Sequence, residues 1–173
     1  MQITTLLDYK NPGVEDCIRA LKYDGSSSAA ELLAEALADY LREEITQAKS
    51  FSPRAILLVP IPLHKNRKRE RGFNQMEAVL QKLPEEFQDG TLAIISARAL
   101  VRTRETKQQT RLPRAERLKN MTGAFSVTDE NSVKDSHVFL IDDVTTTGAT
   151  LSEAAYPLST VGAVVSALAL ARA

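Results

Sequence analysis

The 173-residue sequence lacks the features that mark several classes of protein. It has one cysteine, Cys17, which excludes an intrachain disulfide and a zinc site built from cysteines. It has no tryptophan, and only 5% of its residues are aromatic, so there are few platforms on which nucleic-acid bases could stack. No apolar run is long enough to span a bilayer, and no signal-peptide pattern follows Met1. We therefore expect a cytoplasmic protein with no membrane insertion.

The sequence also lacks a net charge, because 22 lysines and arginines balance 22 aspartates and glutamates. The basic residues are nevertheless unevenly distributed. Segments 64–72 and 98–119 hold 13 of the 22 and contain only three acidic residues. Such segments face either an anionic ligand or water.

The apolar pattern predicts one α/β domain, for which 173 residues are sufficient. Continuous apolar runs that alternate with amphipathic segments are typical of a mostly parallel sheet flanked by helices. The expected strands are 55–59, 92–95, 123–127, 138–141 and 163–171, and the expected helices are 14–23, 74–83, 150–158 and one that opens with a capping box from Ser28 to Glu31.

The most informative segment is VFLIDDVTTTGATL, from Val138 to Leu151. In parallel sheets ligands bind at the carboxyl ends of strands, where Asp142 and Asp143 are expected. The threonines and Gly148 that follow lead into a helix, whose N-terminus favours a phosphate. Carboxylates followed by phosphate donors suit a sugar phosphate. The alternative is an acidic turn before a helix cap, but two charges beside a buried strand are costly without partners.

This segment resembles the motif with which type I phosphoribosyltransferases bind phosphoribosyl pyrophosphate (PRPP). The resemblance implies that Asp142 and Asp143 address the ribose hydroxyls and lie near a Mg²⁺ that arrives with PRPP. It also implies that a loop cradles the 5-phosphate, formed by Thr145, Thr146, Thr147, Gly148, Ala149 and Thr150.

A second segment, VPIPLHKNRKRERGFNQ from Val59 to Gln75, resembles the ComF family, also called amidophosphoribosyltransferase-like or GntX-type proteins. Leu21-Lys22-Tyr23-x-Gly25 fits the same family. Many ComF proteins carry a four-cysteine zinc module ahead of the transferase part, which one cysteine cannot provide. A further signature is matched by Arg102, Thr106, Gln109, Leu112, Arg117, Asn120, Gly123 and Phe125.

The resemblance also assigns roles to the two basic segments. A pyrophosphate loop is implied at Pro60, Ile61, Pro62 and Leu63, followed by His64, Arg67 and Arg71. A flexible loop, 101–120, is implied to close over the site, with Arg102, Gln109, Arg111, Arg117 and Asn120. Arg102 and Arg117 join the two aspartates as candidate catalytic residues.

The resemblance implies a single domain, 1–173, with a helical hood at 1–50 and a PRPP-binding core at 51–173. The implied reaction transfers the phosphoribosyl group to an acceptor that the sequence does not identify, and the implied role is in natural competence. Single-stranded DNA, a competence helicase and a second copy of the chain are the implied partners. Two alternatives stay open: a non-catalytic sensor of PRPP or a nucleotide, and a competence accessory protein that binds single-stranded DNA through its basic segments.

Overall fold

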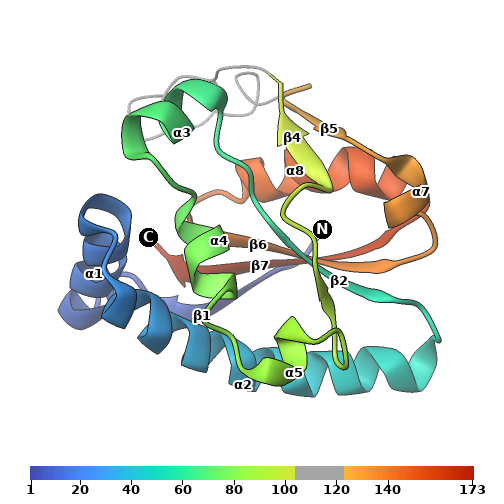
Figure 1. Cartoon of the computed structure of the whole chain (residues 1–173), viewed down its shortest axis with the longest axis horizontal. Helices are drawn as coiled ribbons and strands as arrows, with labels where there is room; N and C mark the ends of the chain where they lie inside the picture. Colours follow the sequence, from blue (N-terminus) through green and yellow to red (C-terminus); the bar gives the residue numbers. More distant parts are fainter. Residues whose placement is uncertain (104–122) are drawn as a thin grey trace.

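Five parallel strands form the centre of the fold in the computed structural model, which describes residues 1–103 and 123–173 (Figure 1). Their order across the sheet is β1-β7-β6-β2-β3. The predicted α/β class with a mostly parallel sheet is therefore confirmed. The strands are β1 (Ile3–Asp8), β2 (Ile56–Pro60), β3 (Ile94–Ile95), β6 (His137–Thr145) and β7 (Val164–Arg172).

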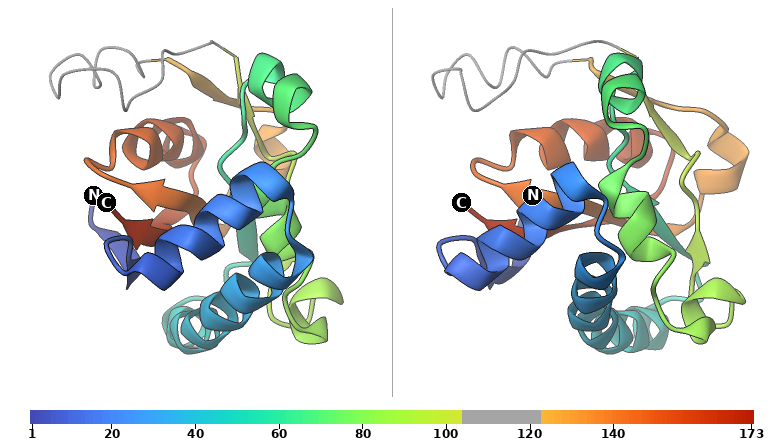
Figure 2. Two further views of the ribbon diagram at one scale, coloured as in Figure 1. Left: turned by 90° about the vertical axis from the view of Figure 1, so that its left-hand side faces the viewer. Right: turned by 60° about the vertical axis from the view of Figure 1, so that its left-hand side comes forward.

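Alternation along the central strands divides the apolar residues between two cores, one on each face of the sheet. In β6, Phe139 and Ile141 join the core beneath the long helix α2 (Ser27–Phe51) and α4 (Gln75–Leu80). Val138 and Leu140 join the core beneath α8 (Ala149–Thr160). Figure 1 and Figure 2 show α2 and α8 on opposite faces of the sheet.

The N-terminal segment combines one strand with two short helical elements, α1 (Pro12–Arg19) and a single π-helical turn, η1 (Ala20–Asp24). Strand β1 was not predicted, because its residues are only half-buried at the edge of the sheet and form no continuous apolar run. The π turn ends at Gly25, whose φ of 61° suits glycine.

The predicted capping box at Ser28 is wrong. The side chain of Ser26 accepts the hydrogen bond from the Ala29 backbone N–H, so helix α2 begins two residues earlier. The cause is Gly25, because its left-handed backbone ends η1 and makes Ser26 the next capping position. Glu31 instead pairs with Lys82.

The remaining elements are short. The predicted strand at 123–127 is confirmed as β5 (Phe125–Val127), which pairs with β4 (Leu100–Arg102) in an antiparallel ladder. The basic segment forms a helix, α3 (Lys65–Arg71), and two single turns are α5 (Glu85–Gln88) and α7 (Glu130–Val133). Among the described residues, none of the helices combines the length and apolar character needed to cross a bilayer.

Candidate functional site

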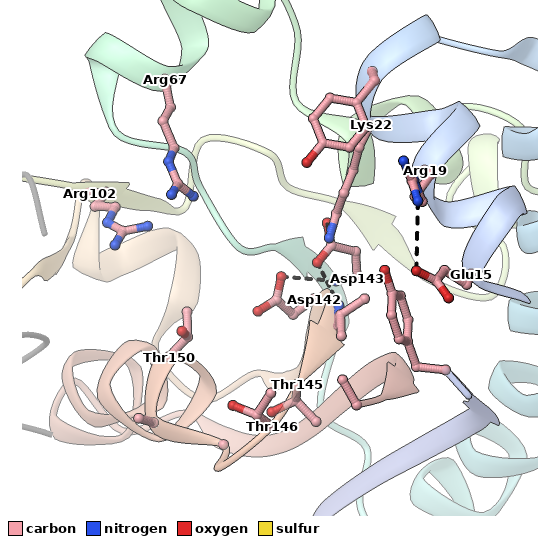
Figure 3. Close-up of a pocket in the computed structure, with 16 residues that line it drawn as sticks. Glu15, Arg19, Lys22, Arg67, Arg102, Asp142, Asp143, Thr145, Thr146 and Thr150 are labelled. Carbon is pink, nitrogen blue, oxygen red and sulfur yellow. Dashed lines mark hydrogen bonds and ion pairs between the residues drawn. The ribbon is translucent and has the colours of Figure 1, made fainter. Parts of the chain in front are cut away.

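A cleft of about 680 Å³ opens at the carboxyl ends of three adjacent parallel strands (Figure 3). Tyr9 follows β1, Asp142 and Asp143 lie in the last part of β6, and Ala173 follows β7, and all four line the cleft. This is the edge at which parallel sheets bind ligands.

The two aspartates are part of strand β6 and do not follow it, because the strand continues to Thr145. Asp142 pairs with Ala169 in β7, and its Oδ1 accepts a hydrogen bond of 2.9 Å from the Asp143 backbone N–H. Desolvation and the neighbouring charge of Asp143 raise the pKa of Asp142 to about 7. A carboxylate in this position gains stability from any hydrogen-bond donor or cation that a ligand brings.

The loop after β6 forms the floor of the cleft. Gly148 has a φ of 78° and turns the chain into α8, which begins at Ala149. Thr145, Thr146 and Thr150 line the cleft together with Gly148 and Ala149. Thr147 does not line it, and its hydroxyl oxygen accepts a hydrogen bond of 3.4 Å from the Ala149 N–H. The first turn of α8 thus opens toward the cleft with its partial positive charge.

Two arginines approach the cleft from the side opposite Glu15, Arg19 and Lys22 in Figure 3. Arg67 comes from α3 and Arg102 from β4, where the Arg102 guanidinium lies 5.5 Å from the centre of the Phe125 ring. Burial, followed by repulsion from Arg67, lowers the pKa of Arg102, whereas the charge of Asp142 opposes this shift. Two partly desolvated cations near one another favour an anionic ligand between them.

The rest of the predicted pyrophosphate loop supports the cleft without lining it. The Ile61 N–H donates to Ile141 O at 2.8 Å, and Asn74 Nδ2 donates to Ile61 O at 3.0 Å, which holds the loop between β6 and α4. His64 caps α3 by accepting the Asn66 N–H at 3.3 Å. Pro60, Pro62, Leu63 and Arg71 are also absent from the lining, so Arg67 alone of this segment faces the cleft.

Comparisons with known proteins agree with this fold. The model of the phosphoribosyl transferase domain matches residues 28–173, which is most of the chain. The chain belongs to the ComF family of phosphoribosyltransferase-domain proteins. Its fold is the type I phosphoribosyltransferase fold.

Relatives of this ComF-family chain come from several bacteria. Competence protein ComFC of Bacillus subtilis is 33% identical over 155 residues, which are 90% of this chain and 52% of that protein. DNA utilization protein YhgH of Escherichia coli is 31% identical over 163 residues, 94% of this chain and 67% of that protein. Competence protein ComFC of Streptococcus pneumoniae is 30% identical over 153 residues, which are 88% of this chain and 60% of that protein. The chain thus spans about half to two thirds of the length of these relatives.

The ComF signature residues at the N-terminal end form the side of the cleft opposite the two arginines. Lys22 and Tyr23 line the cleft with Tyr9, Glu15 and Arg19. A Cβ at Gly25 would lie 3.5 Å from the Phe73 ring, so two parts of the signature that are distant in the sequence pack together. The sequence resemblance alone does not indicate that Tyr9, Glu15 and Arg19 line the cleft.

Two residues that the sequence analysis left without a site role contact the acidic pair directly. Lys22 Nζ lies 3.1 Å from Asp143 Oδ2, and Gln75 Nε2 donates to the same oxygen at 2.5 Å. Both residues belong to the ComF signatures, which do not indicate what either side chain contacts. Four other candidates, Gln109, Arg111, Arg117 and Asn120, lie outside the described residues.

The acidic pair suits a Mg²⁺ ion that is bound partly by protein carboxylates and partly by the phosphates of a ligand. Mg²⁺ prefers oxygen ligands and commonly takes only one or two carboxylates from the protein, with substrate phosphates and water completing its shell. Asp142 supplies such an oxygen in the cleft, and within residues 1–103 and 123–173 no group of three or more potential ligands forms a self-sufficient metal cage.

Proposed function

We propose that this chain binds PRPP with Mg²⁺, transfers the phosphoribosyl group to an acceptor and releases pyrophosphate. The observation that carries the proposal is the convergence of three chemically different groups in one cleft. Asp142 lies at its centre, the threonine loop with the N-terminus of α8 forms its floor, and Arg67 and Arg102 form one side (Figure 3).

In this proposal each group takes one part of PRPP. The threonine loop and the first turn of α8 bind the 5-phosphate, whose charge suits a helix N-terminus. Asp142 accepts hydrogen bonds from the ribose hydroxyls. Arg67 and Arg102 bind the pyrophosphate, to which their paired charges are matched.

The reaction breaks the bond between the anomeric carbon and the pyrophosphate oxygen, and pyrophosphate leaves with the bonding electrons. The acceptor donates a lone pair to the opposite face of that carbon, which inverts its configuration. Arg67 and Arg102 stabilise the negative charge that grows on the leaving group, and Mg²⁺, when bound, adds to this stabilisation. The N-terminal side of the cleft, with Tyr9, Arg19 and Tyr23, is left for the acceptor.

Isothermal titration calorimetry of the protein with PRPP tests the binding step, with and without Mg²⁺. We expect metal-dependent binding that Asp142→Asn weakens by about a hundredfold, as for loss of a hydrogen-bonding charge in a site. Asp16→Asn, an exposed aspartate of α1 away from the cleft, is the matched control. No binding by the intact protein, or equal binding by Asp142→Asn, would contradict the proposal.

Turnover is tested separately, because a PRPP sensor would bind the ligand in the same way. Release of pyrophosphate is measured with Mg²⁺ and PRPP across a panel of nucleobases and amines. Release that depends on one acceptor supports the transferase. Tight PRPP binding with no release for any acceptor supports the sensor.

A second candidate function is binding of single-stranded DNA, consistent with the competence and DNA utilization names of the relatives. Helix α3 carries three exposed cations, Lys65, Lys68 and Arg69, and Lys68 is paired with Glu77. Fluorescence anisotropy with a single-stranded oligonucleotide tests it. Affinity that falls steeply with salt and is weakened in Lys65→Ala/Arg69→Ala supports this function. Affinity unchanged in that variant assigns the binding elsewhere.

A further inference from the structure

Phe125 is a residue of the ComF signature to which the proposed function gives no role. It belongs to β5, and its partner across the ladder is Arg102 of β4. The Thr103 N–H donates to Ala124 O at 2.9 Å, so this neighbouring pair is hydrogen-bonded. Because hydrogen-bonded and non-hydrogen-bonded pairs alternate in an antiparallel ladder, Arg102 and Phe125 form a non-hydrogen-bonded pair, in which opposite side chains come closest.

The Phe125 ring is held in place by the core. The residue is 6% exposed and belongs to the core beneath α8, together with Leu100 and Ala124. Helix α8 packs against β5 and lies beside it in Figure 1. The centre of the ring lies 5.5 Å from Cζ of Arg102, which is within the range of a cation–π contact. A side chain that lines the cleft thus rests on one that is fixed by packing.

Arg102 needs such a contact because its surroundings disfavour a positive charge. Burial, followed by repulsion from Arg67, lowers the pKa of Arg102. An arginine nevertheless stays charged in a protein, so its charge must be stabilised by neighbouring groups. The negative face of the Phe125 ring is one such group, and Asp142 is another. A guanidinium whose face rests on a ring directs its N–H groups sideways, in the plane with which it binds phosphate.

We propose that Phe125 is a positioning residue, which holds the Arg102 guanidinium in the orientation that binds the pyrophosphate of PRPP. This inference rests on the proposed binding of PRPP. Phe125 is not among the residues that line the cleft, so it acts through Arg102 and not by touching the ligand. Its effect is therefore confined to the pyrophosphate end of the site, and binding of the 5-phosphate by the threonine loop does not depend on the ring.

The test compares two ligands that occupy different ends of the cleft in the proposed function. Inorganic pyrophosphate with Mg²⁺ binds at Arg67 and Arg102, and ribose 5-phosphate binds at the threonine loop. Calorimetry measures both affinities in Phe125→Leu, which keeps an apolar side chain and removes the ring. We expect the pyrophosphate affinity to fall about tenfold, as for loss of a partly desolvated cation–π contact, and the ribose 5-phosphate affinity to change by less than about twofold.

Two further variants separate the contact from general packing. Phe125→Tyr keeps the ring and is expected to bind pyrophosphate within about threefold of the intact protein. Phe87→Leu is the matched control, because this buried ring lies 5.9 Å from Cζ of Arg42 and does not line the cleft. We expect Phe87→Leu to leave both affinities unchanged. Equal losses of both affinities in Phe125→Leu, or none, would overturn the proposal.

A double-mutant cycle shows whether the ring acts through Arg102. Arg102→Gln alone is expected to weaken pyrophosphate binding by about tenfold or more, because a charge-assisted contact is lost. In that background Phe125→Leu is expected to cause no further loss, since the guanidinium that the ring holds is absent. A second loss of about tenfold in the double variant would overturn the proposal, because the ring would then act by another route.

Failure of the proposed function can be told apart from failure of this inference. If the intact protein binds PRPP and Phe125→Leu binds it equally well, only this inference fails. If the intact protein binds neither PRPP nor pyrophosphate, the proposed function fails, and the contact is judged by urea unfolding of the same variants. Non-additive losses of unfolding free energy in Phe125→Leu and Arg102→Gln support the contact, and additive losses overturn it.

Discussion

Ile3 lies directly against Gly148, although the two residues are far apart in the sequence. A Cβ atom added to Gly148 would collide with Cδ1 of Ile3. Gly148 also has a φ of 78°, which side chains other than glycine rarely adopt. The first strand of the sheet thus supports the loop that is proposed to bind the 5-phosphate.

Gly148→Ala is expected to lower the free energy of unfolding and to weaken PRPP binding. The left-handed backbone alone costs about 1–2 kcal/mol, and Ile3 must also change rotamer. Gly90→Ala is the matched control, because Gly90 has a φ of 84° but nothing within 4 Å of an added Cβ. Urea unfolding and calorimetry measure both effects. Equal destabilisation by the two variants, with PRPP affinity intact in both, would contradict the role of the Ile3 contact.

Asp142→Asn is expected to stabilise the fold at alkaline pH. The raised pKa, about 7 against an ordinary 3.8, means that the folded state holds this proton more tightly than the unfolded chain. Stability is therefore lost as the pH rises from about 4 to about 7. Asparagine removes the charge and keeps the Oδ1 acceptor for the Asp143 N–H. The gain in Tm over the intact protein should be larger at pH 8 than at pH 5. A gain of equal size at both pH values would show that the charge of Asp142 is not the cause.

Arg67→Gln is expected to weaken PRPP binding by about tenfold or more, because a charge-assisted contact to pyrophosphate is lost. Arg69→Gln is the matched control on the same helix, since Arg69 is exposed and does not line the cleft. Calorimetry at two salt concentrations measures both variants. If both variants lose affinity equally, helix α3 acts through its overall positive charge, and Arg67 makes no specific contact with pyrophosphate.

Arg54→Gln is expected to make the protein less sensitive to acid. Burial, followed by the charge of Arg54, lowers the pKa of His137, which stacks on Phe139 with ring centres 4.8 Å apart. The unfolded chain then takes up this proton more readily, so stability falls as the pH drops below about 6.5. Without Arg54, the loss of Tm between pH 7.5 and pH 5.5 should be smaller. An unchanged loss of Tm would mean that burial alone lowers the pKa of His137.

The sequence predicted the central strands and the acidic motif because both depend on local pattern. The apolar run before Asp142 is long, buried on both faces and bounded by a recognisable loop. Strand β1 escaped prediction because its half-buried residues, including Thr4 and Thr5, lack that run. Its place beside β7 depends on pairing with residues that are distant in the sequence.

The contacts around Asp143 could not be predicted from local pattern. Gln75 and Asp143 are 68 positions apart, and Lys22 reaches them from a π-helical turn. The family signatures showed that these residues belong together, but only the arrangement of η1, α4 and β6 shows that they meet at one oxygen. The same reason explains why the contact between Arg71 and Gln75 was not predicted.

The pairing of β1 with β7 has a consequence for synthesis on the ribosome. Translation produces Ile3 long before its partner in the sheet, Ala167, because nearly the whole domain lies between them in the sequence. Strand β1 cannot pair with β7 until the helices and strands between them have been synthesised. The loop at Gly148 gains its support from Ile3 only when β7 has been made, so the site is among the last parts of this domain to be completed.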